Sequence, residues 1–148
     1  MTQLRIVLAF IGSVLVALVI AAAAHTQFVL AGLTGLGVDI PVGVRVSTTA
    51  RDIVGLAPSY GAIIAAGFLI AFGVAAVVRR YTTTLGPVAF PIAGAVAIAA
   101  ALVLMNLSFP GTPLAGARST AGIAAQVIAG GMGGWVFARL ARRRDPAQ

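Results

Sequence analysis

Residues 6–24 of this chain read IVLAFIGSVLVALVIAAAA, a run of apolar and small residues without one charged side chain. A helix needs about 20 such residues to cross the roughly 30 Å hydrocarbon layer of a membrane. Three similar runs follow at residues 60–78, 88–107 and 120–140. The runs lack the strict alternation of a barrel strand, and in lipid each amide must be satisfied within its own segment. The four runs therefore predict four transmembrane helices.

The composition of the whole chain agrees with this class. Of its 148 residues, 60% are hydrophobic and 9% are charged, and the mean hydropathy is +1.07. A soluble domain has about 25% charged residues. We therefore expect an all-α membrane protein, a single transmembrane domain over residues 1–148, folded as a four-helix bundle.

The arginines predict the orientation of the bundle. Seven of them fall on one side of a four-span chain and three on the other: Arg5, Arg79, Arg80, Arg139, Arg142, Arg143 and Arg144 against Arg45, Arg51 and Arg118. Because cytoplasmic segments carry the excess of basic residues, both termini are expected inside, with residues 141–148 as a basic cytoplasmic tail. This anchoring also explains the net charge of +7, so no nucleic-acid partner is expected.

The sequence also bears on where the protein is located and on whether its first span is removed as a signal peptide. The complete absence of lysine indicates a GC-rich bacterium, so we expect a multi-pass protein of the bacterial inner membrane. An alternative stays open at the start of the chain. Residues 22–24 are three alanines before His25, which resembles a signal-peptide cleavage site. Cleavage there would leave three spans with the same orientation.

The outer connection between the first two spans, residues 25–59, is too long for a simple loop and predicts local structure. Residues 28–30 are apolar, so the first span can extend outward through them. Residues 40–46 alternate between apolar and other residues. Thr49 and Asp52 have the spacing of a capping box ahead of an apolar stretch. We therefore expect a structured outer loop with a short helix at the membrane interface.

Small residues recur at every fourth position of each span and predict its packing faces. Such faces let helix backbones approach closely, which drives association in lipid. Large aromatic side chains would then face lipid or a partner: Phe68, Phe72, Trp135 and Phe137. Glycines on more than one face of the fourth span predict a second close contact, with another span of this chain, a second copy or a foreign subunit. The leading expectation is a homo-oligomer or a larger membrane complex. The main packing residues are Gly122, Gly130, Gly134 and Ala138 in the fourth span, and Ser13, Ala17 and Ala21 in the first.

Polar residues gather at the predicted outer surface, where the second and fourth spans begin. Helix N-termini and arginines favour anions, so this surface is a candidate site for a membrane lipid headgroup or another anion. The alternative is ordinary interfacial chemistry: helix-capping serines and the ion pairs Arg51–Asp52 and Arg45–Asp39. The candidate site comprises Arg51, Arg118, Ser119, Thr120, Gln126 and His25.

Gln126 is the most informative polar residue because it shares a stripe with the glycines of the fourth span. It should therefore face protein. A buried amide at this position would bridge to Ser13 or His25 as structural glue, or else contact a ligand or line a pore.

No residue pattern in the chain indicates catalysis. There is no cysteine, and the only charged residue within the four spans is Arg139, next to the end of the fourth. The single histidine has no cysteine, methionine or second histidine nearby. No metal, cofactor or enzymatic activity is expected. The leading hypothesis is a non-catalytic accessory or assembly subunit. The alternatives are a carrier or channel with an arginine-lined outer mouth, and a protein that binds anionic lipid headgroups at the outer leaflet.

Overall fold

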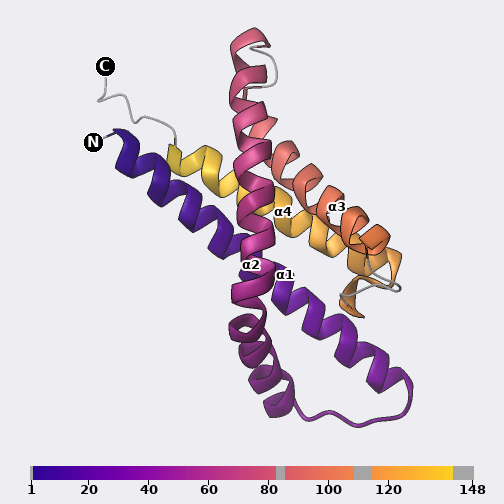
Figure 1. Ribbon diagram of the computed structural model, residues 1–148. Helices are drawn as coiled ribbons and strands as arrows, with labels where there is room; N and C mark the ends of the chain where they lie inside the picture. Colours follow the sequence, from indigo (N-terminus) through magenta and orange to yellow (C-terminus); the bar gives the residue numbers. More distant parts are fainter. Residues whose placement is uncertain (1, 83–85, 109–114, 142–148) are drawn as a thin grey trace.

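The computed structural model describes residues 2–82, 86–108 and 115–141, and these residues are helical apart from short connections. The four α-helices are α1 (Thr2–Gly35), α2 (Val42–Tyr81), α3 (Ala89–Ser108) and α4 (Thr120–Ala141), with a 3-10 turn η2 (Ala115–Ala117) before α4 (Figure 1). Residues 142–148 of the expected basic tail lie outside the described residues, as do parts of the two short connections on either side of α3.

The prediction of an all-helical bundle with four long apolar helices is confirmed. Each of the four helices is long and apolar enough to cross a membrane. The bounds of α3 and α4 differ from the predicted spans 88–107 and 120–140 by no more than one residue. The bundle is therefore that of a multi-pass membrane protein.

The structure differs from the sequence prediction at residues 25–59. α1 continues to Gly35 and α2 already begins at Val42, so the connection is only residues 36–41. The expected interfacial helix is instead the first part of α2, which runs through Pro58 without ending. At about 1.5 Å per residue, α2 is roughly 60 Å long, about twice the thickness of the hydrocarbon layer.

Gly37 ends α1 in a way that reverses the chain. Its φ of +89° is a left-handed conformation that glycine adopts without steric cost. The amide of Gly37 donates to the carbonyl of Thr34 at 3.0 Å, and that of Val38 donates to Leu33 at 3.3 Å. These two bonds form a Schellman motif, which satisfies the last carbonyls of the helix.

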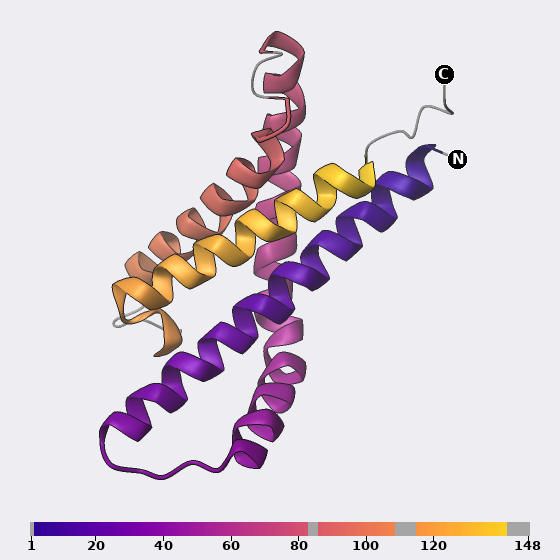
Figure 2. The ribbon, with the colours of Figure 1, turned by 180° about the vertical axis from the view of Figure 1, so that it is seen from behind.

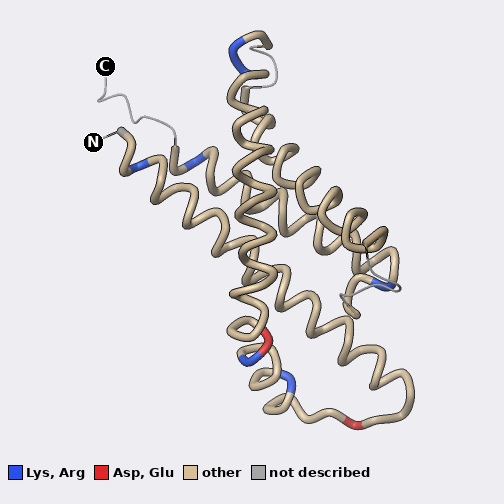
Figure 3. The backbone as a smooth tube through the Cα atoms, in the orientation of Figure 1, with Lys and Arg blue, Asp and Glu red and all other residues tan. Residues whose placement is uncertain are grey.

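The helices are splayed rather than parallel. α1 and α4 run side by side, α3 packs on α4, and α2 crosses α1 and contacts α3 (Figures 1 and 2). We call the end with the start of α1 and the ends of α2 and α4 the terminal end. The opposite end, with the α1–α2 connection and η2, is the hairpin end. Charged residues gather toward these two ends (Figure 3).

Five phenylalanines from all four helices form an aromatic cluster. The ring of Phe72 lies 4.6 Å from that of Phe137, 4.7 Å from Phe68 and 5.6 Å from Phe90. It also meets Phe10 edge-on at 6.4 Å. The expectation that Phe68, Phe72 and Phe137 face lipid or a partner was wrong, because all three are buried within this bundle. Trp135, by contrast, is 49% exposed.

Glycines bring the backbones of α3 and α4 into direct contact. A Cβ atom at Gly94 would collide with the carbonyl of Gly130, and one at Gly134 would collide with that of Phe90. On the other face of α4, a Cβ at Gly133 would lie 2.8 Å from the ring of Phe68 and 2.9 Å from the Cβ of Ala17. The glycine-rich segment of α4 is therefore enclosed by α1, α2 and α3.

Candidate functional site

Two consecutive hydrogen bonds inside the bundle link α2, α4 and α1. The hydroxyl of Tyr60 donates to Oε1 of Gln126 at 2.8 Å, and Nε2 of Gln126 donates to the carbonyl of Ala21 at 2.9 Å. Gln126 is fully buried. Ser13 and His25, the partners expected from the sequence, are not the ones used, since Ser13 donates to the carbonyl of Phe10. These two hydrogen bonds link three helices in the buried interior of the bundle.

His25 fastens η2 to α1. Its Nδ1 accepts a hydrogen bond from the amide of Gly116 at 3.2 Å. A Cβ on residue 116 would lie 2.6 Å from the Cα of His25, so only glycine fits at this contact. The imidazole of His25 is half-buried, and its Nδ1 is already bonded to the backbone of η2, which is a structural contact. Within the described residues no group of three His, Cys, Asp or Glu side chains is placed to hold a metal ion.

The first turn of α4 is capped by Ser119. Its hydroxyl accepts a hydrogen bond from the amide of Gly122 at 3.0 Å, the usual N-cap arrangement. Arg118, Ser119 and Thr120 are all exposed. The helix N-terminus that was expected to attract an anion thus already has one of its amides satisfied by the protein itself.

Polar side chains join α1 to α2 at the hairpin end. Thr26 lies 2.7 Å from the carboxylate of Asp52, and Gln27 donates to Thr49 at 3.1 Å. Arg45 donates to Thr34 at 3.0 Å and contacts the side-chain oxygen of Gln27 at 3.4 Å. Asp52 and Arg45 thus take neutral partners across the hairpin, whereas the sequence predicted ion pairs with Arg51 and Asp39.

The six residues of the predicted anion site differ in burial and in their partners. Gln126 and His25 are bonded to other parts of the protein, whereas Arg51, Arg118, Ser119 and Thr120 are exposed. In the described part of the chain, no hydrogen bond joins any two of the six. Every buried polar side-chain atom described there has a partner, so none is left aimed at a ligand.

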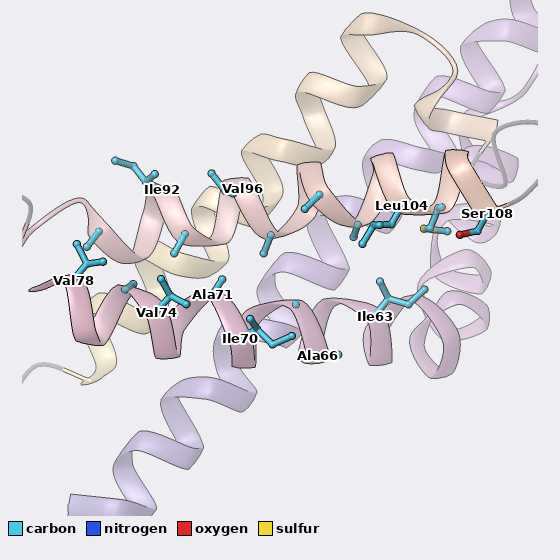
Figure 4. A pocket seen from close by; sticks show the side chains of 18 residues that line it. Ile63, Ala66, Ile70, Ala71, Val74, Val78, Ile92, Val96, Leu104 and Ser108 are labelled. Carbon is cyan, nitrogen blue, oxygen red and sulfur yellow. The ribbon is translucent and has the colours of Figure 1, made fainter.

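Two cavities that the sequence analysis missed lie on opposite faces of α2. The first, which we call the α2–α3 cleft, has a volume of about 780 Å³ (Figure 4). The second, the terminal pocket, has a volume of about 790 Å³ and lies between α2 and the ends of α1, α3 and α4. Small residues at every fourth position of a span were predicted to form packing faces. Such stripes, for example Ala93, Ala97 and Ala101 in α3, line the α2–α3 cleft. Those stripes are the sequence signal that could have revealed it.

Comparison with known proteins gives no relative: no family model, no curated protein and no solved structure matches the chain.

Proposed function

We propose that this chain is a non-catalytic membrane subunit whose α2–α3 cleft receives a transmembrane helix of another polypeptide chain. The observation that carries the proposal is the cleft itself. It follows α2 from Ile63 to Val78 and α3 from Ala89 to Ser108, which corresponds to about 22 and 28 Å of helix. A cleft of this length extends through most of the hydrocarbon layer.

The surface of the cleft suits a helix. Its floor is made of small residues, and a Cβ at Gly67 would lie 3.6 Å from the Cβ of Ala97, so the two walls meet there. Its rims carry exposed branched side chains such as Ile70 and Val96. Among the described residues that line the cleft, Ser108 is the only one with a polar side chain. Helices associate in lipid by close van der Waals contact, and this arrangement of small floor and branched rims provides it.

The polar residues give less support to the two other hypotheses. Gln126, Arg51 and Arg118 line neither cavity, and Gln126 has both ends of its amide bonded to protein. A carrier path along Gln126 would need this amide to line a cavity, and the exposed Arg51 and Arg118 border neither of the two cavities. No observation in the structure therefore favours either hypothesis over a packing subunit.

The membrane placement is part of the same proposal. The arginine distribution supports the terminal end in the cytoplasm and the hairpin end outside, in a bacterial inner membrane.

Single cysteines can test the proposal cleanly because the natural chain contains none. Ile70→Cys places a thiol on the rim of the cleft, and Val19→Cys is a matched control on an exposed position of α1 that lines neither cavity. Each variant is labelled with a benzophenone maleimide in native membranes and irradiated. We expect a discrete protein adduct from Ile70→Cys, either a dimer or a complex with one other subunit, and none from Val19→Cys.

The second part of the experiment fills the cleft with a larger side chain. Ala93→Leu in the Ile70→Cys background should abolish the adduct, because the larger side chain occupies the space of the incoming helix. If Ile70→Cys gave only lipid adducts, or the same products as Val19→Cys, the proposed function would be wrong.

A further inference from the structure

The terminal pocket is separate from the α2–α3 cleft, and the two share no lining residue. They lie on opposite faces of α2. A ligand in the terminal pocket is therefore independent of the function proposed above, and each can be tested without the other.

The inner surface of the terminal pocket is aromatic. Phe10, Phe72, Phe90 and Phe137 line it, and their rings contact one another at 4.6 to 6.4 Å. Such a set of interlocked rings is held in place by the core of the bundle. It offers a fixed apolar wall of the kind that a hydrocarbon chain can cover.

One cation borders this apolar wall. Arg79 is the only charged residue among the described residues that line the pocket. Its guanidinium lies 5.1 Å from the centre of the Phe90 ring, and the residue remains exposed. The ring contact positions the planar group while leaving its N–H edge available to an acceptor, and a guanidinium binds phosphate with two parallel hydrogen bonds.

Basic residues lie at the terminal end, on the side of the bundle where the pocket opens. Arg5 donates from Nε to the carbonyl of Leu140 at 2.8 Å, which places a second cation beside the end of α4. Asp39 and Asp52, the acidic residues that the structure describes, lie at the hairpin end. The third, Asp145, is outside the described residues. Among the described residues that line the pocket, Arg79 therefore gives the rim a positive charge that is complementary to an anion.

The depth of the pocket matches one leaflet of a membrane. Along α2 the lining runs from Leu69 to Arg79, which is about 15 Å of helix. This is half of the roughly 30 Å hydrocarbon layer. With Arg79 at the rim and apolar side chains below it, the pocket has the polarity profile of a single lipid of the leaflet at the terminal end.

We propose that the terminal pocket binds an anionic phospholipid, with its phosphate on Arg79 and an acyl chain against the ring of Phe72. A lipid in this site would contact both a positioned guanidinium and an apolar wall. This differs from the general attraction of basic residues to an anionic surface. Neutral phospholipid would fill the apolar part without the charge contact.

The chain offers a matched control for the headgroup. Arg79→Gln and Arg80→Gln each remove one positive charge from consecutive, exposed positions, but only Arg79 lines the pocket. The purified full chain is titrated in neutral detergent with phosphatidylglycerol, with phosphatidylcholine and with inorganic phosphate, and retained lipid is read by native mass spectrometry. We expect Arg79→Gln to weaken phosphatidylglycerol binding about tenfold, since a hydrogen bond to a charged group is lost, and Arg80→Gln to change it less than about twofold.

The acyl-chain part of the site has its own variant. A Cβ on Gly73 would meet no atom within 4 Å, and Gly73 lines the pocket, so the side chain of Gly73→Leu begins in open space and extends into it. It should reduce retention of both phospholipids, while Gly55→Leu, at an equally open position outside the pocket, should not. Equal losses from Arg79→Gln and Arg80→Gln would show only general surface attraction and overturn the proposal. Full retention by Gly73→Leu, or saturable binding of phosphate alone at the same strength, would overturn it too.

Discussion

The hydroxyl of Tyr60 on α2 and the amide of Gln126 on α4 form a 2.8 Å hydrogen bond between fully or almost fully buried side chains. Because Gln126 also donates to the carbonyl of Ala21 on α1, one amide fixes the relative depth of three helices.

Removing the Tyr60 hydroxyl should therefore destabilise the bundle. We expect Tyr60→Phe to lower the free energy of unfolding by about 1 kcal/mol, since buried hydrogen bonds between membrane helices are worth this order of energy. Reversible unfolding in mixed micelles measures it. A double-mutant cycle with Gln126→Leu should show coupling of the same size, and additive effects of the two changes would contradict a direct bond.

The contact between Gly130 and Gly94 predicts a contrast between neighbouring glycines. A Cβ at Gly130 would lie 2.5 Å from Ile98 and would collide with the Gly94 carbonyl, whereas one at Gly131 finds its nearest neighbour at 3.6 Å. We expect Gly130→Ala to destabilise the bundle by about 2 kcal/mol or more through overpacking. Gly131→Ala should be neutral or stabilising by up to about 1 kcal/mol, because alanine has the higher helix propensity.

The same unfolding measurement applies to both glycine variants. A loss of stability from Gly131→Ala as large as that from Gly130→Ala would mean that α3 and α4 do not cross where the structure places them.

The aromatic cluster predicts a similar contrast between large residues. Phe72 contacts four other rings and is buried, so Phe72→Ala should cost about 3 kcal/mol or more through the cavity it leaves. Trp135 is half-exposed and stacks only on Arg139 among the rings and cations described. We expect Trp135→Ala to cost less than about 1 kcal/mol, a difference visible in thermal unfolding in detergent. Equal costs would show that Phe72 is not central to the core.

The proposed orientation has a direct chemical test. Leu36 lies in the α1–α2 connection and is 82% exposed. In intact cells, Leu36→Cys should react with a membrane-impermeant maleimide from outside. Gln3→Cys, near the start of α1, should react only after permeabilisation. The reverse labelling pattern would show that the bundle has the opposite orientation in the membrane.

The number and type of helices could be predicted from sequence because apolar length is a local property. The apolar runs that form α3 and α4 show no competing pattern, such as the strict alternation of a strand. The buried position of Gln126 also followed from its glycine stripe. Its partner Tyr60 could not be found this way, because it depends on the register of two helices 66 residues apart in the chain.

Two errors have a common physical cause. His25, Thr26 and Gln27 resembled the end of a span because they are polar, yet α1 continues and two of them reach partners on α2. Phe72 and Phe137 were expected to face lipid or a partner because they are large, yet the glycines of α4 make room for rings inside the bundle. Polarity and size describe a residue alone, whereas its face in a bundle is decided by the neighbouring helix.

The length of α2 makes the molecule sensitive to bilayer thickness. Even at a tilt of about 40°, a layer of roughly 30 Å encloses only about 26 residues of helix, whereas α2 has 40. At least a third of α2 must therefore stand in the headgroup region or beyond it. A thicker membrane would draw Asp52 and its contact with Thr26 toward hydrocarbon at an electrostatic cost, so the membrane itself sets how far the hairpin end emerges.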